Sequence, residues 1–307
     1  PGPDGIHPRV LNELSAVIAK PLHLIFQDSL RSGMVPRNWR IANVVPLFKK
    51  GSRSQPENYR PVSLTSVVGK LLEGVIRDRV LEYIAVHNTI SLCQHGFMRN
   101  RSCQTNLVAF YEEVSRNLDA GMAVDVIYLD FAKAFDTVPH RRLMIKLRNI
   151  GLEHNICNWI ENWLKDRVQR VVVNGTFSNW TIPLNVGVPQ GSVLGPLLFS
   201  LYTLSLGDLI RSFGFKYHLY ADDIQIYLST PSLTAETETQ ISNCLLAISN
   251  WMNHRHLKLN LTKTELMIFL PKPGPTPPFS ISIDGTLINP VDSAHCLGVI
   301  FDSSLLF

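Results

Sequence analysis

The amino-acid sequence predicts an α+β fold built on an antiparallel sheet. Helical and strand-like patterns interleave along the chain, and pairs of strand-like segments are separated by short turns, as in hairpins. The 307 residues are 45% apolar and 18% charged, which provides a sizeable core and argues against disorder. The 18 Gly and 19 Pro show no period, so collagen-like and coiled-coil classes are excluded.

Apolar spacing predicts the elements of the first 120 residues. Helices are expected over residues 10–31, 67–86 and 104–118. Between the first two helices, residues 41–48 have the pattern of a strand, and Pro46 should confine this strand to a sheet edge because proline cannot donate to a ladder. The surrounding segment, 37–62, carries six cations against the single acid Glu57.

The remaining residues alternate between strands and helices. A buried strand is expected at 124–129, and Asn174-Gly175 joins a strand pair. A proline-rich turn is expected at 271–278. The other expected helices are 141–150, 156–164, 193–206 and 235–254. The other expected strands are 168–173, 180–184, 213–219, 224–228, 265–270, 279–283 and 296–301.

Charge and cysteine content limit the environment and the partners. The five cysteines are odd in number and never spaced as C-x-x-C, which favours a reducing compartment without a Cys-rich zinc site. The net charge is only +4, so local basic clusters would have to bind any polyanion. The uncharged stretch 171–207 is broken by polar residues, and its most apolar part falls short of the ~20 residues of a membrane-spanning helix. No membrane association is expected.

Two acidic sequences adjoin predicted strands. Asp130 ends an apolar run, where its carboxylate would either cap the next helix or hold a cation. Asp222 and Asp223 lie between two alternating strands, where Asp also suits an ordinary turn. Because the flanking strands are strongly apolar, this hairpin should sit on a core and bring its carboxylates to the strand end at Asp130. Oxygen ligands suit Mg²⁺, and two such ions can activate both oxygens of a phosphoryl transfer.

A third signal is Gly187-Val188-Pro189-Gln190-Gly191-Ser192. Its Gly and Pro residues indicate a tight, rigid backbone, and Ser192 suits a helix N-cap. The segment is either a turn that starts a helix or a close-fitting wall for a flat ligand, with Gln190 as the polar contact.

In this order, these segments resemble the reverse transcriptase family, and in particular the non-LTR (LINE-type, jockey-like) retrotransposon enzymes. The resemblance covers essentially the whole chain. Residues 130–136 look like motif A, residues 187–195 like motif B and residues 220–223 like motif C. Five more blocks are similar to family blocks: 3–6, 58–64, 94–97 with Arg99 and Arg101, 259–260 with 263–265, and 297–299 with Asp302.

The resemblance implies the fingers and palm of a right-hand polymerase. Residues 1–120 would form the fingers, with 137–185 contributing. Residues 121–136 and 186–307 would form the palm, an antiparallel sheet with helices packed on one face. A thumb and an endonuclease are expected to be absent from this segment.

The resemblance also implies site residues. Asp130, Asp222 and Asp223 would be catalytic and would hold two Mg²⁺ ions, with Mn²⁺ as a substitute. Phe135 would be a steric gate that favours dNTP over rNTP, although a Phe here also suits a core position. The remaining dNTP-binding residues would be Lys49 and Arg60 on the triphosphate, Gln190 at the nascent base pair, and Lys263, which would protonate the leaving pyrophosphate. Each of the three cations also suits a solvated surface.

The implied function is an RNA-directed DNA polymerase, a nucleotidyltransferase that extends a DNA primer on an RNA template with dNTPs and serves retrotransposition. The expected localisation is intracellular, in the nucleus at the site of integration after a cytoplasmic ribonucleoprotein stage. Two alternatives stay open. One is a catalytically inactive nucleic-acid-binding remnant of the same fold. The other is a related polymerase such as a group II intron maturase, which Phe135 and the block at 297–299 disfavour.

Overall fold

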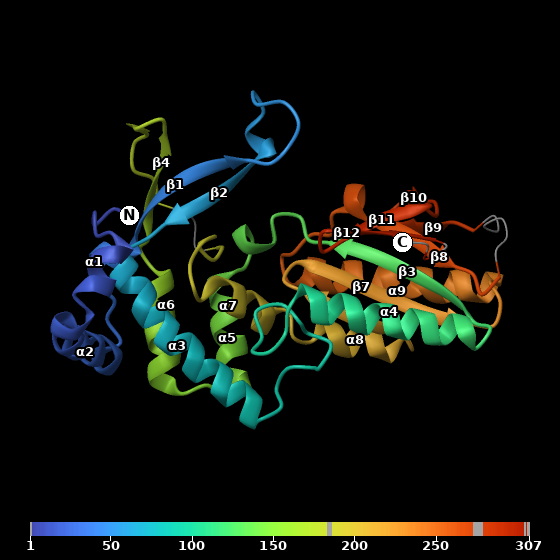
Figure 1. The fold of residues 1–307 in the computed structure, drawn as a ribbon, viewed down its shortest axis with the longest axis horizontal. Helices are drawn as coiled ribbons and strands as arrows, with labels where there is room; N and C mark the ends of the chain where they lie inside the picture. The colour runs from blue at the N-terminus through green and yellow to red at the C-terminus, as the bar shows by residue number, and fades with distance from the viewer. Residues whose placement is uncertain (1, 183–185, 273–278, 304, 306–307) are drawn as a thin grey trace. The chain divides into compact units, whose positions relative to one another are not determined.

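The computed structural model describes residues 2–182, 186–272, 279–303 and 305 (Figure 1). The chain divides into two compact units. The first unit comprises Pro1–Thr89 and Phe135–Tyr202, and the second comprises Ile90–Ala134 and Thr203–Phe307. The predicted division into fingers and palm follows other boundaries and stays a prediction. Within the described ranges, no helix is long and apolar enough to cross a membrane.

The first unit contains a four-stranded sheet in the order β2-β1-β4-β5. Its strands are β1 (Ile41–Phe48), β2 (Tyr59–Leu64), β4 (Val168–Val173) and β5 (Thr176–Phe177). The predicted edge position of β1 is wrong, because β1 pairs antiparallel with β2 and parallel with β4. The parallel pairing with β4 covers only the start of β1 and ends at Val44. Pro46 therefore lies beyond the reach of β4, where its missing N–H leaves no bond unmade.

Helices complete the first unit: α1 (Pro8–Glu13), α2 (Ser15–Ser32), α3 (Val67–Val86), α5 (His140–Ile150), α6 (His154–Leu164) and α7 (Gly195–Tyr202), with short 3₁₀ turns at Arg37–Arg40, Pro56–Asn58 and Ala134–Asp136. The single helix expected over 10–31 is two helices that meet at Leu14. Helix α2 ends at Gly33 in a left-handed cap with φ 68°.

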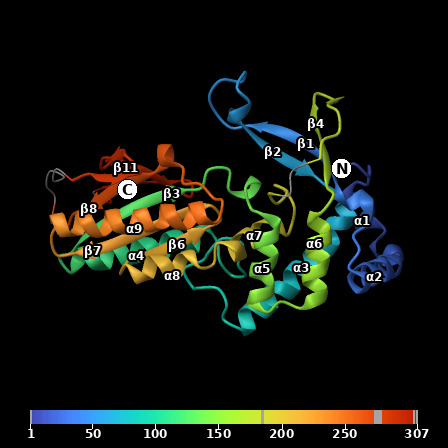
Figure 2. The ribbon, with the colours of Figure 1, turned by 180° about the vertical axis from the view of Figure 1, so that it is seen from behind.

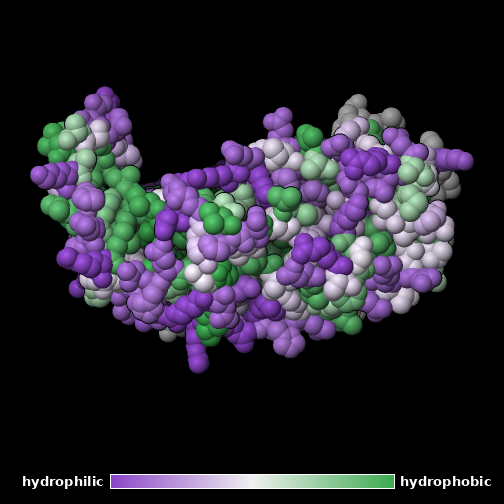
Figure 3. Space-filling model, turned by 90° about the horizontal axis from the view of Figure 1, so that it is seen from below, coloured by the Kyte–Doolittle hydropathy of each residue, from purple (hydrophilic) through white to green (hydrophobic). Residues whose placement is uncertain are grey.

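The core of the first unit lies between α3, α5 and α6, where side chains such as Leu72, Leu147, Trp159 and Trp163 are buried. Helices α1 and α2 contribute less to it. Val10, Val17 and Leu24 are exposed, and Figure 3 shows apolar side chains gathered at the left, where these helices lie. Ser29 is the residue of α2 that is buried.

The second unit is built on a four-stranded antiparallel sheet in the order β6-β7-β3-β8. Its strands are β3 (Ala123–Asp130), β6 (Lys216–Tyr220), β7 (Asp223–Thr230) and β8 (Glu265–Phe269). Every residue of β3 is buried, which explains its nearly continuous apolar sequence, because a central strand covered on both faces needs no alternation. The antiparallel sheet is confirmed.

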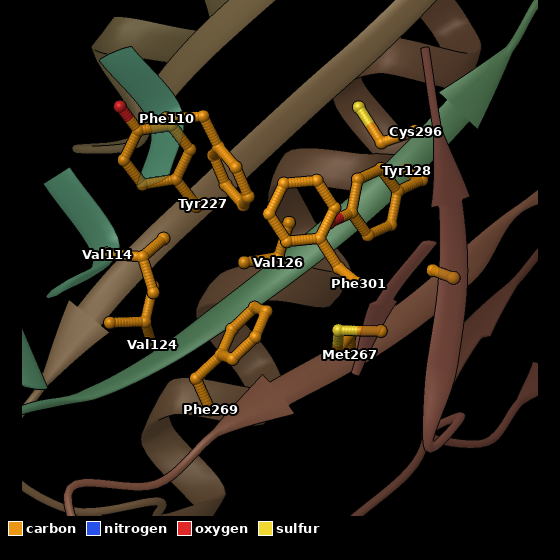
Figure 4. Close-up of a cluster of buried hydrophobic side chains, with 11 residues drawn as sticks. Phe110, Val114, Val124, Val126, Tyr128, Tyr227, Met267, Phe269, Cys296 and Phe301 are labelled. Carbon is orange, nitrogen blue, oxygen red and sulfur yellow. The ribbon is translucent and has the colours of Figure 1, made fainter. Parts of the chain in front are cut away.

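The helices of the second unit lie on both faces of this sheet, so the packing on one face that the sequence predicted is corrected. Helix α4 (Cys103–Asp119) covers one face, and α9 (Ala235–His254) runs along the other beside the short α8 (Leu206–Ser212) (Figures 1 and 2). Val124, Val126 and Tyr128 of β3 pack with Phe110 of α4 and with Phe301 in one cluster (Figure 4). Helices on both faces thus account for the burial of every residue of β3.

Two hairpins end the chain. They are formed by β9 (Ile281–Ile283) with β10 (Thr286–Ile288) and by β11 (Ser293–Cys296) with β12 (Val299–Asp302). The single strand expected at 296–301 is wrong, since Leu297 and Gly298 have φ values of 49° and 87° and reverse the chain. Likewise, the helix expected at 193–206 stops at Tyr202 and α8 begins at Leu206. The expected strand at 180–184 and turn at 271–278 lie partly outside the described residues.

Candidate active site

Three carboxylates gather at one end of the sheet of the second unit. Asp130 is the last residue of β3, and Asp223 is the first residue of β7. The two strands are antiparallel and Asp130 is directly opposite Asp223 in the ladder, while Asp222 precedes it in the turn from β6. Strand direction thus brings acids that are far apart in sequence to the same end of the sheet, as the sequence predicted.

Lys263 joins these acids from a 3₁₀ turn, Leu261–Lys263, just before β8. Its ammonium donates a hydrogen bond to Oδ2 of Asp130. This bond raises the pKa of Lys263, and the nearby charges of Asp130, Asp222 and Asp223 raise it further, against the opposing effect of burial. One cation therefore faces all three carboxylates, and this end of the sheet favours positive charge.

Asp130 is held in place by its surroundings. Its side chain is 11% exposed. Its backbone carbonyl accepts a bond from the N–H of Asn260 at 2.8 Å, and the Asn260 amide lies 3.4 Å from Oδ2. The segment before Lys263 thus fixes both the backbone and the carboxylate at the end of β3. The possibility that Asp130 merely caps a helix receives no support, because a 3₁₀ turn at Ala134–Asp136 is the next helical element.

The donor set can be compared with what a divalent ion requires. Carboxylate oxygens are the ligands that Mg²⁺ prefers, and the ammonium of Lys263 at the same place shows that this end of the sheet attracts a cation. In the described part of the chain, no group of three His, Cys, Asp or Glu side chains is arranged around a single metal position. The oxygen ligands of these residues are of the type that a divalent ion binds, and in this structure the ammonium of Lys263 provides the positive charge beside them.

A second set of candidate residues lies in the first unit. The segment 187–192 is bound to the stretch that follows Phe135: Val188 N–H donates to the carbonyl of Phe135 at 2.7 Å and Gly187 N–H to that of Val138 at 2.8 Å. The amide of Gln190 donates to Asp136 at 2.9 Å. Strand β2 also contributes, because Ser63 N–H donates to the Gln190 carbonyl at 2.7 Å. This network makes the segment a rigid wall.

A cavity of about 430 Å³ adjoins this wall. Ser63, Asp136, His140 and Gln190 are among the residues that line it. The Nε2 atom of His140 lies 2.7 Å from the Gly187 carbonyl and donates a hydrogen bond to it. Burial lowers the pKa of His140 and the charge of Arg167 lowers it further, while the bond to Gly187 opposes this. Gln190 therefore lies on a rigid segment beside a cavity, and its role as a ligand contact stays a prediction.

Phe135 is half-buried, and its ring packs on that of Phe199 in α7, with centroids 5.1 Å apart. The unit boundary falls between Ala134 and Phe135. The structure therefore describes the surroundings of Phe135 within the first unit, and its predicted role as a gate stays a prediction.

Lys49 and Arg60 lie on a single hairpin, the one formed by β1 and β2. Lys49 directly follows β1, and its N–H donates to the Asn58 carbonyl at 2.8 Å. Arg60 is in β2, opposite Leu47. Both residues are exposed. The hairpin therefore presents two cations to solvent, an arrangement that permits binding of a polyphosphate and also suits a solvated surface.

Comparison with known proteins decides the family. Residues 48–301 match the family described as reverse transcriptase (RNA-dependent DNA polymerase). The chain belongs to the reverse transcriptase family. It is 28% identical over 320 residues to the probable RNA-directed DNA polymerase from transposon BS of Drosophila melanogaster. It is also 28% identical over 316 residues to the RNA-directed DNA polymerase from mobile element jockey of the same species.

Both comparisons cover 100% of the chain and 34% of the relative, so the chain spans about a third of the length of these curated relatives. A solved structure of apo telomerase from Candida tropicalis, truncated from its C-terminal domain, has a TM-score of 0.57 and 13% identity. That similarity covers 88% of this chain and 56% of the telomerase chain. The LINE-type resemblance and the fingers-and-palm fold are confirmed. Reverse transcriptases generally use divalent metal ions.

One buried acid with a structural role was not predicted from the sequence. Glu73 in α3 is 2% exposed. Its carboxylate accepts bonds from the indole of Trp163 at 3.2 Å and from Val193 N–H at 2.8 Å and Leu194 N–H at 3.3 Å. Burial raises its pKa, while these bonds and the charge of Arg167 oppose the rise. Glu73 thus anchors the start of α7 directly after the Gln190 segment. An acid beside the apolar stripe of the helix at 67–86 was the signal for it.

Proposed function

We propose that this chain is the polymerase core of an RNA-directed DNA polymerase that extends a DNA primer along an RNA template with dNTPs. The observation that carries the proposal is that Asp130, Asp222 and Asp223 lie together at one end of the sheet, where the positive charge of Lys263 faces them. The family match over residues 48–301 supports the same reaction. The activity, the nucleic-acid partners and the role in retrotransposition are proposals, because the chain spans a third of its relatives.

We assign the residues as follows. Asp130, Asp222 and Asp223 would hold two Mg²⁺ ions, with Mn²⁺ as a substitute. Such ions lower the pKa of an attacking hydroxyl and neutralise charge on phosphates. Asp130 is oriented by Asn260 before any ligand binds. Lys263 is bound to Asp130 and would have to leave that carboxylate in order to donate a proton to a pyrophosphate oxygen.

The nucleotide would be bound by residues of the first unit. The exposed cations Lys49 and Arg60 suit the triphosphate, Lys as a point charge and Arg through two parallel bonds. Gln190, fixed by Asp136, would line the nascent base pair. Phe135 would exclude a ribose 2′-hydroxyl. As for the place of action, we propose the nucleus after a cytoplasmic ribonucleoprotein stage, because integration needs chromosomal DNA.

The deciding experiment is primer extension by the 307-residue chain on poly(rA)/oligo(dT) with dTTP, with and without Mg²⁺. We expect extension that depends on Mg²⁺ and on the RNA template. Binding of the primer–template without extension, in Mg²⁺ or in Mn²⁺, would instead support the inactive nucleic-acid-binding remnant.

Replacement of Phe135 by Val should relax sugar selection. The ratio of kcat/KM for dNTP to that for rNTP should fall by about 10- to 200-fold, because the ring that would clash with the 2′-hydroxyl is removed. Single-nucleotide incorporation measures the ratio. The matched control is Phe135→Tyr, which keeps a ring and should keep the discrimination. An unchanged ratio in Phe135→Val would leave Phe135 as a packing partner of Phe199 alone.

A further inference from the structure

A short segment of the second unit, residues 93–97, lies along the edge strand β6 and reaches the turn that carries Asp222. The N–H of Leu219 donates to the Cys93 carbonyl at 2.9 Å. In return, the Leu219 carbonyl accepts bonds from His95 N–H at 2.8 Å and from Gly96 N–H at 3.4 Å. The segment therefore pairs with the end of β6 as a short parallel bridge, only three residues before Asp222.

Gly96 is the point of closest approach. A Cβ atom built on it would lie 2.4 Å from the backbone nitrogen of Ala221, 3.1 Å from the carbonyl carbon of Tyr220 and 3.2 Å from its Cα. All three are backbone atoms, so no side-chain movement could relieve the contact. Only glycine permits this approach. The touched residue, Ala221, has φ 58°, a left-handed conformation that a non-glycine residue adopts only when its surroundings impose it.

His95 anchors the same segment through its side chain. One ring nitrogen lies 3.1 Å from the Thr105 hydroxyl of α4 and the other 3.4 Å from Nδ1 of His218 in β6. His218 continues the chain to the hydroxyl of Tyr227 in β7, 3.1 Å away. Burial lowers the pKa of both histidines, that of His218 to about 4, with Arg101 adding to the effect on His95 and Glu113 opposing it on His218. Neutral rings provide the one donor and one acceptor each that such a chain needs.

The loop around the segment is closed by Arg101. Its guanidinium donates to the carbonyls of Ser91 at 3.1 Å, of Leu92 at 2.8 Å and of Gln94. In the structure its guanidinium holds the loop backbone, which makes segment 93–97 a fixed support.

We propose that Gly96 and His95 are positioning residues that hold the β6–β7 turn, and with it Asp222 and Asp223, in the geometry required for catalysis. This inference rests on the proposed polymerase function. Neither residue touches the reacting atoms. Gly96 sets the position of the turn by backbone contact, and His95 ties the support to both strands of the hairpin.

The first test is Gly96→Ala. For an ordinary contact of 3.4 Å the turn would have to move by about 1 Å, and a 1 Å misplacement of catalytic groups costs on the order of 10²-fold in rate. We expect kcat for primer extension to fall by about that factor with KM for dNTP little changed, because four of the five predicted dNTP contacts lie in the first unit, namely Lys49, Arg60, Phe135 and Gln190. The matched control is Gly74→Ala in α3, where a Cβ meets nothing within 4 Å, and its kcat should be unchanged.

Amide hydrogen exchange provides a readout that needs no activity. In Gly96→Ala, exchange should accelerate in residues 216–227 while other strands keep their protection. His95→Gln, which leaves the backbone bonds in place, should accelerate exchange in the same residues by a smaller factor and serves if Gly96→Ala does not fold. Unchanged exchange at 216–227, or equal changes in kcat and KM, would overturn the proposal. If the unaltered chain shows no extension, the proposed function fails. The exchange result would still test whether segment 93–97 holds the β6–β7 turn in place.

Discussion

Asp222→Asn should reduce Mg²⁺-dependent primer extension by roughly 10³-fold or more and leave the fold intact. Asn keeps the size of the side chain but removes its charge and one strong metal-ligating oxygen. The site depends on that charge, because Asp222 is one of the three acids that raise the pKa of Lys263. The fold should tolerate the change, since Asp222 lies in a turn and is only partly buried.

The measurement is kcat/KM for single-nucleotide incorporation, with circular dichroism as a check of folding. Asp208→Asn is the matched control: it removes the same charge in the same unit, from an exposed residue of α8 that pairs with Arg211. Its rate should stay within about two-fold of the unaltered chain. If Asp222→Asn and Asp208→Asn have equal activity, the assignment of Asp222 is refuted.

The stability of the second unit should fall as the pH rises from about 4 to 7, because of Asp125. This residue lies in the middle of β3 and is 0% exposed, and neither of its carboxylate oxygens has a hydrogen-bond partner among the described residues. Burial raises its pKa from 3.8 to about 7. Between about pH 4 and pH 7, Asp125 is therefore protonated in the folded state and ionised in the unfolded state.

The sign follows from this difference. Below pH 4 both states are protonated and the full stability is present; above pH 7 the folded state must carry a buried charge or unfold. A difference of about three pKa units corresponds to a loss on the order of 4 kcal/mol in the free energy of unfolding. Urea unfolding at pH 5 and pH 8 measures the part of this loss that falls above pH 5. Asp125→Asn should remove most of this pH dependence, whereas Asp208→Asn should retain it. Equal slopes in both variants would exclude Asp125 as the cause.

The spacing of apolar residues predicted those helices and strands in which the buried side chains recur at a regular interval or form one continuous apolar run. The helices at 67–86 and 235–254 and the apolar strand before Asp130 are present with bounds close to those expected. The errors arise where distant pairing or a special backbone conformation decides. Pro46 indicated an edge strand, but β4 pairs with the part of β1 that precedes it. Leu297 is in a left-handed conformation that is rare for leucine, so its turn was read as strand.

The candidate site was predictable to the extent that topology follows from strand order. A hairpin packed on a neighbouring strand brings Asp222 and Asp223 to Asp130, and an antiparallel sheet was expected. The bond from Lys263 to Asp130 depends on the pairing of β8 with β3 and on a 3₁₀ turn, neither of which leaves a sequence signal. Glu73 was missed for a related reason: its partners, Trp163 and the start of α7, are about a hundred residues away.

The two units are interleaved along the chain. The polypeptide passes from one to the other after Thr89, Ala134 and Tyr202. Ile41 must find Val168 before the first sheet can close, and the whole of β3 is synthesised in between. Pairing across such separations slows folding, because loop-closure entropy is lost before the contacts form. Neither unit can thus be excised as one continuous stretch, and neither can be completed during synthesis until residues as far as Tyr202 or beyond have left the ribosome.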